Sequence, residues 1–375
     1  MSLDFEQGPI RPPSEAESLL VRITRNCPWN KCLFCPVYKK KKFSRRGLEE
    51  VKEDISAMKK AADKIYDTAS EMGYKEVNRN VLEKVYKENP DLLQIAFWLF
   101  RGGKNVFLQD ADSLVMPTEQ LSEAISYLKE QFPTIERITT YSRSKTVSRR
   151  SVEELKMLKE AGLTRVHIGM ETGHDPLLEY MRKGVTSEQH VEAGLKVKEA
   201  DLSLSEYVLL GLGGKEMWKE HAINTADVLN RIDPHFIRIR TLAVRKGIPL
   251  KENIASGEFQ MQDDEGTVME ERLLVENLDC HSYFVSDHIL NLLEEVEGQL
   301  PGDKNAMLSV IDDYLSMPSD KRMNYRLGRR LGLYRYLRDM NIIERYNQVE
   351  DIRRQVQEKG MDEEEFLNQY ISQYV

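Results

Sequence analysis

The chain has 375 residues, of which 41% are hydrophobic and 31% are charged, and its net charge at pH 7 is −8. This length and composition are those of a globular protein with one large core or two moderate ones, and the acidic balance argues against a protein that binds nucleic acid over its whole surface. No stretch is long and apolar enough to span a bilayer, and the first twenty residues lack the pattern of a secretion signal, so a cytoplasmic protein is expected.

Strands and helices are predicted to alternate along the first 250 residues. Short apolar and β-branched runs predict strands at 19–25, 104–109, 137–142, 164–170, 204–212 and 236–242. Helical spacing predicts helices at 47–62, from 117 onward, and at 151–162, 175–183, 186–200 and 217–231. The helices at 151 and 186 have capping-box start signals, Ser151 with Glu154 and Thr186 with Gln189. Strands that are each followed by a helix indicate a parallel sheet with crossover helices.

Two parts of the chain depart from this alternation. The polar, helix-prone stretch near 60–100 ends in the apolar run LLQIAFWLF and is interpreted as a helical insertion before the second strand. From about residue 250 onward the strand signals stop, and the segments to Val375 have helical spacing and strong charge. The predicted organisation is therefore a domain over 1–250 that contains the insertion, followed by a helical region over 251–375.

Three of the four cysteines, Cys27, Cys32 and Cys35, lie on the loop after the first predicted strand. In a reducing compartment such a cluster indicates metal ligands rather than disulfides, and the carboxyl ends of parallel strands are where such folds carry their chemistry. A structural zinc site would need a fourth ligand from Cys280 or a distant histidine. Three thiolates on one loop can instead hold three corners of a four-iron cluster and leave one iron open. The iron–sulfur cluster, with Cys280 outside it, is the preferred interpretation.

The motifs, in their order along the chain, resemble the radical S-adenosylmethionine (radical SAM) superfamily. The cluster loop of that family reads C-x3-C-x2-C with an aromatic residue before the last cysteine; here Phe34 is that residue, and the first spacing is one residue longer. The segments HIGMETG, LLEYMRKGVT and VLLGLGG are similar to the branch of the oxygen-independent coproporphyrinogen III oxidases and the elongator catalytic subunits. The resemblance covers 19–245 and implies an α/β fold, a partial (β/α)6 TIM-like barrel with a C-terminal helical region.

The resemblance also implies the cofactors and the reaction. The three cysteines would hold a [4Fe–4S] cluster, and the open iron would bind the amino and carboxylate groups of S-adenosyl-L-methionine. Electron transfer would then cleave this cofactor to a 5'-deoxyadenosyl radical, which abstracts hydrogen from a substrate that the sequence does not identify. Because only Cys280 lies outside the loop and no D-x-H-x-x-G motif is present, neither an auxiliary cluster nor cobalamin is expected.

Several residues fall at positions that meet the cofactor in the family. Glu171 matches a position that contacts the ribose, Lys183 one that contacts the carboxylate, and Gly211 lies where the backbone approaches adenine. The segment with Asp110 and Asp112 stands where the family has a Gly-Gly-Glu-like segment. The whole set of expected cofactor-binding residues is Phe34, Asp110, Asp112, Arg143, Glu171, Lys183 and Gly211.

Plainer interpretations stay open beside these. Glu171 could pair with Arg165 or Arg182 at the strand end, and Lys183 could be a favourable charge at a helix C-terminus. A non-catalytic iron–sulfur or zinc protein, and an RNA-binding or RNA-modifying protein that uses the lysine run 39–42, are the alternative functions. The partners expected of the radical SAM enzyme are an electron donor such as flavodoxin or ferredoxin and an unidentified substrate, which the basic residues after the cysteine loop could meet if it is anionic. Neither a membrane nor a nucleic acid is an expected partner.

Overall fold

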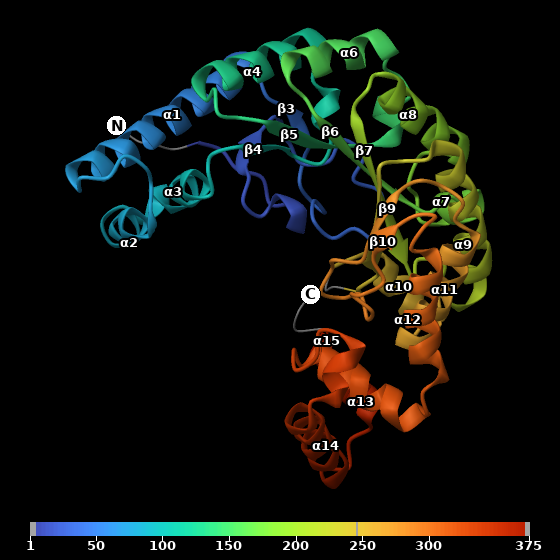
Figure 1. Ribbon diagram of the computed structural model, residues 1–375. Coiled ribbons are helices and arrows are strands. Elements are labelled where there is room, and N and C mark those ends of the chain that lie inside the picture. Colours follow the sequence, from blue (N-terminus) through green and yellow to red (C-terminus); the bar gives the residue numbers. More distant parts are fainter. Residues whose placement is uncertain (1–4, 245–246, 372–375) are drawn as a thin grey trace. The chain divides into compact units, whose positions relative to one another are not determined.

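The computed structural model describes residues 5–244 and 247–371 (Figure 1). The chain divides into two compact units. The first unit comprises the chain up to Asn30, Lys40–Gly169 and Glu192–Leu204, and the second comprises Lys31–Lys39, Met170–Val191 and the chain from Ser205 onward. None of the described helices is both long enough and apolar enough to cross a membrane.

Parallel strands form the sheet of the first unit, in the order β1, β4, β5 and β6. Their bounds are β1 (Leu19–Arg22), β4 (Asn105–Gln109), β5 (Arg137–Ser142) and β6 (Arg165–Glu171), the last two residues of β6 belonging to the second unit. Val106 lies opposite both Leu19 and Ile138 in adjacent strands, and all three side chains are buried. Most positions along these strands are buried, as is typical of parallel strands that are covered on both faces.

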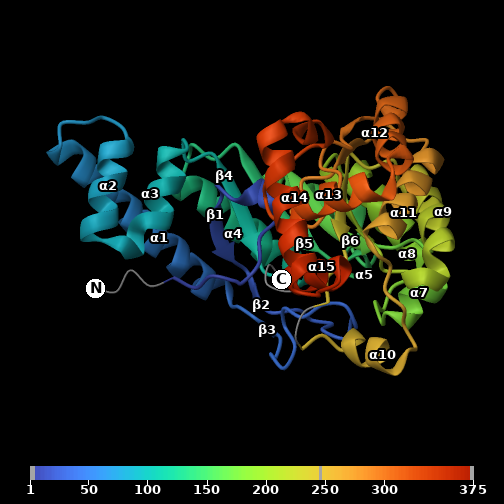
Figure 2. The same cartoon turned by 90° about the horizontal axis from the view of Figure 1, so that it is seen from below.

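Helices α1 (Leu48–Glu71), α4 (Thr118–Gln131) and α6 (Val152–Ala161) lie along one face of these strands (Figure 1). Helix α1 runs nine residues beyond its predicted end because buried residues such as Ile65 and Ala69 continue its apolar face. Helices α2 (Arg79–Glu88) and α3 (Leu93–Phe100) pack beside α1 in the stretch interpreted as an insertion (Figure 2). The 3-10 helices of this unit are η1 (Pro13–Glu15), η2 (Pro90–Leu92) and η3 (Ser113–Val115).

The start signals predicted for two helices are confirmed. Ser151 Oγ accepts the Glu154 N–H at 3.1 Å, and the Glu154 carboxylate accepts the Ser151 N–H at 2.8 Å. Thr186 and Gln189 make the same reciprocal pair, at 3.3 and 3.2 Å, before α8 (Ser187–Glu199). Helix α6 ends at Gly162, whose φ of +128° is one that residues with a side chain rarely adopt.

The second unit also contains parallel strands. Strands β7 (Ser203–Leu210, from Ser205 in this unit), β8 (Phe236–Thr241) and β9 (Tyr283–Val285) pair in parallel, and β10 (Gly298–Gln299) pairs antiparallel with β9. Helix α7 (Asp175–Tyr180) precedes β7, and α9 (Gly214–Ile232) connects β7 to β8. The order strand, helix, strand is thus the predicted one, and the α/β class with mostly parallel strands is confirmed.

The remainder of the second unit is mainly helical. Its helices are α10 (Leu250–Ser256), α11 (Asp264–Asn277), α12 (Lys304–Ser316), α13 (Ser319–Arg330), η4 (Leu337–Asn341), α14 (Ile343–Glu358) and α15 (Glu363–Ile371). Helices α13, α14 and α15 pack against one another (Figure 2). The expectation that strand signals stop at residue 250 is wrong in one respect, since β9 and β10 lie beyond it. Strands of two or three residues are too short to show a period of two in the sequence.

Candidate functional site

The cysteine loop connects two short strands that the sequence does not separate from the first strand. The predicted strand 19–25 is divided: β1 ends at Arg22, and β2 (Thr24–Arg25) pairs antiparallel with β3 (Ser44–Arg45). The two ends of the loop are therefore held side by side. The loop also contains a fold-back near its start, where Cys27 Sγ accepts the Asn30 N–H at 3.4 Å.

Asparagines shape the first part of the loop. Asn26 and Asn30 have φ values of +67° and +48°, which asparagine tolerates better than most residues. Their side-chain amides donate to the carbonyl oxygens of Lys42 (2.7 Å) and Lys41 (3.3 Å), respectively, and so join the start of the loop to its end. Cys27, Cys32 and Cys35 are half-buried, whereas Cys280 is 2% exposed. Burial raises the pKa of the Cys280 thiol, which disfavours the thiolate that a metal requires.

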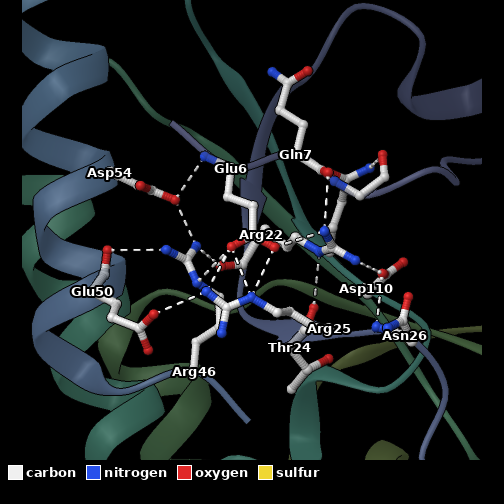
Figure 3. A network of polar contacts seen from close by, with 12 residues as sticks. Glu6, Gln7, Arg22, Thr24, Arg25, Asn26, Arg46, Glu50, Asp54 and Asp110 are labelled. Carbon is white, nitrogen blue, oxygen red and sulfur yellow. Dashed lines mark hydrogen bonds and ion pairs between the residues drawn. The ribbon is translucent and has the colours of Figure 1, made fainter. Parts of the chain in front are cut away.

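A network of ion pairs in the first unit anchors the hairpin that β2 and β3 form at the base of the cysteine loop (Figure 3). Arg22 Nη1 lies 2.7 Å from Glu6 Oε1, and Arg25 Nη2 lies 2.7 Å from Glu6 Oε2. Arg46, which follows β3, pairs with Asp54 of α1 at 2.5 Å and donates to the Arg22 carbonyl oxygen at 2.8 Å. Burial alone would raise the pKa of Glu6, but these arginines, Arg25 foremost, hold it below its usual value.

Asp110 connects the network to the cysteine loop. Its side chain is fully buried at the end of β4, and Oδ2 accepts from Arg22 Nη2 at 2.8 Å and from the Asn26 N–H at 3.1 Å (Figure 3). Asn26 immediately precedes Cys27. Asp110 thus fixes the backbone at the entrance of the loop.

Asp112 and Arg143 form a second group in the first unit. The buried Asp112 carboxylate accepts from the hydroxyls of Ser142 (2.7 Å) and Thr146 (2.5 Å). Burial raises the pKa of Asp112 to about 6, although these hydroxyls and the nearby Arg143 act in the opposite direction. The Arg143 guanidinium stacks over the ring of Trp29, 5.1 Å from its centre, so a residue of the cysteine loop contacts the end of β5.

Glu171, Lys183 and Phe34 form a contiguous group in the second unit. Lys183 Nζ lies 2.9 Å from Glu171 Oε1 and 5.6 Å from the centre of the Phe34 ring. Glu171 has a left-handed φ of +68°, a conformation uncommon outside glycine and asparagine and often found at functional sites. Lys183 lies three positions beyond Tyr180, the last residue of α7, whose last turn contains no basic residue, so it is not a charge in the last turn of that helix. The structure therefore brings together three of the seven residues expected to meet the cofactor.

Glu206 is a buried carboxyl near this group that the sequence reasoning missed. It is 0% exposed, and neither side-chain oxygen has a hydrogen-bond partner. Burial raises the pKa of Glu206 well above its usual value; the charge of Lys183 acts against this shift and that of Glu171 adds to it. A lone acid within the apolar run LSEYVLLGL was the available signal.

Gly211 lies at the end of β7 and is held by a buried polar chain. Its φ is +79°, and its N–H donates to Glu270 Oε1 at 2.9 Å. The same Oε1 lies 3.3 Å from His221 Nε2, and His221 Nδ1 lies 2.8 Å from the Thr172 hydroxyl. The chain thus links the strand end after Glu171 to the strand end at Gly211. Glu270 and His221 were not predicted, because no sequence spacing joins them to either strand.

In the described part of the chain, no three His, Cys, Asp or Glu side chains surround one point as they do in a ready-made site for a single metal ion. A four-iron cluster takes one thiolate on each iron, so its ligands do not share one metal centre. The donor set of three half-buried cysteines with an N–H···S hydrogen bond fits such a cluster, since hydrogen bonds to the sulfurs are typical of iron–sulfur sites.

Curated relatives match parts of the chain. A tRNA uridine(34) acetyltransferase of Methanocaldococcus jannaschii is 25% identical over 118 residues, which are 31% of this chain and 22% of that protein. The chain thus spans about a fifth of the length of that relative.

Solved structures are similar at low identity. Elp3 of Methanocaldococcus infernus has a TM-score of 0.42 at 12% identity, covering 72% of this chain and 57% of that one. Coproporphyrinogen III oxidase (HemN) of Escherichia coli, a radical SAM enzyme, has a TM-score of 0.38 at 15% identity, covering 68% and 58%.

The match to a family model covers more of the chain than the match to that curated relative. The family model described as the Radical SAM superfamily matches residues 21–226, more than half of the chain. The match includes the cysteine loop, Glu171, Lys183 and Gly211. The chain therefore belongs to the radical SAM superfamily, whose members are enzymes that use an iron–sulfur cluster and S-adenosyl-L-methionine.

Proposed function

We propose that Cys27, Cys32 and Cys35 hold three irons of a [4Fe–4S] cluster and that the fourth iron binds S-adenosyl-L-methionine. The observation that carries this proposal is the family match over 21–226, which contains these three cysteines and not Cys280. Held by these cysteines, such a cluster would supply the electron for reductive cleavage of the cofactor, and the resulting 5'-deoxyadenosyl radical would abstract hydrogen from an unidentified substrate. A reductant such as flavodoxin or ferredoxin is the electron source in this proposal.

The residues of the second unit would hold the cofactor. A carboxylate can accept about four hydrogen bonds, so Glu171 can receive ribose hydroxyls while it remains paired with Lys183. Lys183 would meet the carboxylate of the cofactor, and the ring of Phe34 lies beside Lys183. The backbone at Gly211, held by Glu270, would lie against adenine.

The residues of the first unit would have a different task. Asp110 and Asp112 are fully buried and accept hydrogen bonds from neighbouring segments. These contacts support positioning of the cysteine loop and of the end of β5. Arg143, which stacks on Trp29, would hold the loop from the other side.

Iron content tests the ligand assignment. Anaerobic reconstitution with iron and sulfide should give about four irons per chain, and replacing Cys27, Cys32 or Cys35 with Ala should remove the cluster, because each ligand lost leaves an iron under-coordinated. Cys280→Ser is the matched control and should retain the full iron content, because this thiol is buried and its pKa is raised.

Formation of 5'-deoxyadenosine after reduction with dithionite separates the enzyme from a non-catalytic cluster protein. An intact cluster in any one of the three Ala variants would overturn the ligand assignment. A stable cluster without cleavage of the cofactor would overturn the reaction and leave the ligands in place.

A further inference from the structure

The second unit contains a cavity of about 440 Å³ at the carboxyl ends of β7 and β8. Gly211, Thr241 and Leu242 line it at the strand ends, and residues of α11, α13 and α15 line it elsewhere. This volume is within the range of about 300–1,000 Å³ that is typical of small-molecule sites. In α/β folds, ligands bind at the carboxyl ends of the strands.

The lining combines an apolar part with an unusual number of charges. Apolar lining comes from residues such as Leu242, Ile254 and Met261. The charged lining residues are four basic and three acidic: Lys215, Lys251, Arg326, Arg330, Asp263, Asp264 and Glu364. The positive excess favours a ligand that is itself negatively charged.

Two buried arginines of α13 provide the charged wall. Arg326 and Arg330 are 5% and 7% exposed, and both bind the one carboxylate of Asp264, Arg326 Nε at 3.1 Å and Arg330 Nη2 at 2.5 Å. Burial alone would raise the pKa of Asp264, but the two guanidinium groups outweigh burial and lower it. Two buried positive charges thus share the one negative charge of Asp264, whose side chain is 10% exposed, so a second anion is required to neutralise this wall.

Glu364 of α15 is the second anion in this structure. Its carboxylate binds both terminal nitrogens of Arg326, with Nη2 at 2.7 Å from Oε2. The Glu364 side chain is 46% exposed, whereas the Asp264 side chain is 10% exposed. Only the Glu364 side of this pair is exposed, since the Arg326 side chain is 6% exposed. A carboxylate or phosphate of a ligand can therefore replace Glu364 while the buried Arg326 stays paired.

The end of the cavity at Gly211 offers neutral polar groups. Gln262 Oε1 is buried without a hydrogen-bond partner, and it and the Thr267 hydroxyl lie close to Gly211. A buried acceptor without a partner is a group that a ligand donor can satisfy. The cavity therefore provides an anion-binding wall at Arg326 and hydrogen-bonding groups near Gly211.

We propose that this cavity is the substrate pocket and that the substrate carries a carboxylate or phosphate, which replaces the Glu364 carboxylate on Arg326. Its role as a substrate pocket rests on the function proposed above, because Gly211, expected beside the cofactor, lines the same cavity. Hydrogen abstraction requires the substrate next to the cofactor, and one cavity with Gly211 and Arg326 in its lining meets that requirement.

Binding of simple anions to the apo protein tests the proposal. The probes are benzoate and phenyl phosphate, with benzamide as the neutral counterpart, titrated in phosphate-free buffer of low ionic strength and followed by ligand-observed NMR. At least one anion should bind and benzamide should not. Glu364→Gln should tighten anion binding by about two- to ten-fold, because no side-chain carboxylate then competes for Arg326. Arg326→Gln should weaken it by about ten-fold or more.

Glu365→Gln is the matched control, because it removes the same charge from the adjacent position, where the exposed Glu365 side chain accepts from Gln369 Nε2 at 3.2 Å. Benzoate and phenyl phosphate separate a carboxylate from a phosphate as the recognised group. Equal affinities in the Glu364→Gln and Glu365→Gln variants, or equal binding of benzamide, would overturn the proposal. If Arg326→Gln does not fold, the anion affinities of the Glu364→Gln and Glu365→Gln variants still test whether Glu364 competes with the ligand for Arg326. These titrations use neither iron nor cofactor, so their failure is distinct from a failure of the cluster assignment.

Discussion

Glu171, which is expected to contact the ribose of the cofactor, also has an uncommon backbone conformation and a defined ion-pair partner. Its positive φ departs from the extended backbone at the end of β6, and its carboxylate is paired with Lys183 beside the ring of Phe34. The buried carboxyl of Glu206, with its raised pKa, lies near enough for the charges of Glu171 and Lys183 to affect it. A cofactor that brings hydroxyl donors and a carboxylate would engage both members of the ion pair.

Replacement of Glu171 with Ala should weaken binding of S-adenosyl-L-methionine by about ten- to a hundred-fold. The estimate follows from charge-assisted hydrogen bonds worth about 1.5–3 kcal/mol and from about 1.4 kcal/mol for each factor of ten. The measurement is cofactor titration of the reconstituted protein, with iron content unchanged.

Glu179→Ala, which removes an exposed acid on the nearby helix α7, is the control for net charge. If Glu171→Ala binds the cofactor as tightly as the parent protein, Glu171 is a structural partner of Lys183 and the ribose contact lies elsewhere. Partial recovery in Glu171→Gln would identify hydrogen bonding, rather than charge, as the main contribution.

At the residue scale, sequence reasoning reached those positions that have a local signature. The cysteines are close in the chain, and Glu171 and Lys183 lie in a recognisable segment after a strand. Arg326 and Glu364 could not be paired in this way, since 38 positions separate them and only the packing of α13 against α15 brings them together. The same holds for Gly211 and Glu270, which lie 59 positions apart.

At the element scale, the cysteine loop behaves as a hairpin connection with fixed ends. Pairing of β2 with β3 closes its base, and the ion pairs of Arg22 and Arg46 hold the flanking segments to β4 and α1. Asp110 adds a contact to the N–H of Asn26, the residue directly before the first cysteine. A loop whose ends are fixed loses less entropy when it binds a cluster.

Loss of the Asp110 anchor should loosen the loop. Asp110→Ala leaves the Asn26 N–H without this acceptor and removes one of the carboxylates around Arg22. Tryptic cleavage of the native apo protein after the exposed residues Lys40, Lys41 and Lys42 should become several-fold faster.

Glu50→Ala is the matched control for Asp110, because Glu50 pairs with Arg25 in the same network without contacting the loop entrance. Faster cleavage in both variants would indicate general loosening of the network. Unchanged cleavage in Asp110→Ala would show that other contacts hold the loop.

Elements were predicted wherever apolar spacing extends over enough residues. The strands that became β4 to β8 and the capped helices α6 and α8 have such spacing, and they lie within one or two residues of their predicted bounds. The run LLVRITR was wrongly read as one strand because its apolar pattern continues through Ile23, where the chain leaves one sheet for another. Only tertiary pairing of β2 with β3 distinguishes the two parts.

At the scale of the whole molecule, the protein has an acidic net charge, yet several of its arginines are buried. Arg326, Arg329, Arg330 and Arg353 are each less than a tenth exposed, and each has carboxylate partners in the second unit. The strong charge of the region after residue 250, which the sequence analysis assigned to a helical region, is therefore partly internal. Removing one partner from such a pair would be costly, because it leaves a buried charge uncompensated.

Glu271 of α11 should make stability depend on pH. It is 3% exposed, its Oε1 has no partner, and burial together with the charge of Glu270 raises its pKa to about 8. Between its ordinary value of 4.5 and about 8, the folded protein holds a proton that the unfolded chain has released. The contribution of Glu271 to the free energy of unfolding therefore falls as pH rises through this window.

Replacement of Glu271 with Gln, which stays neutral, should remove this loss. The variant should match the parent near pH 5 and exceed it by about 1–4 kcal/mol at pH 8.5, an order-of-magnitude value from 1.36 kcal/mol per pKa unit. Urea unfolding followed by circular dichroism at both pH values gives the comparison. Glu276→Gln, which removes a half-exposed acid from the same helix, should show no such change with pH, because Glu276 pairs with Arg272 at the surface. A gain that is the same at pH 5 and pH 8.5 would mean that Glu271 is ionised in the folded protein at both values, and that its buried carboxylate is neutralised by a group other than a bound proton.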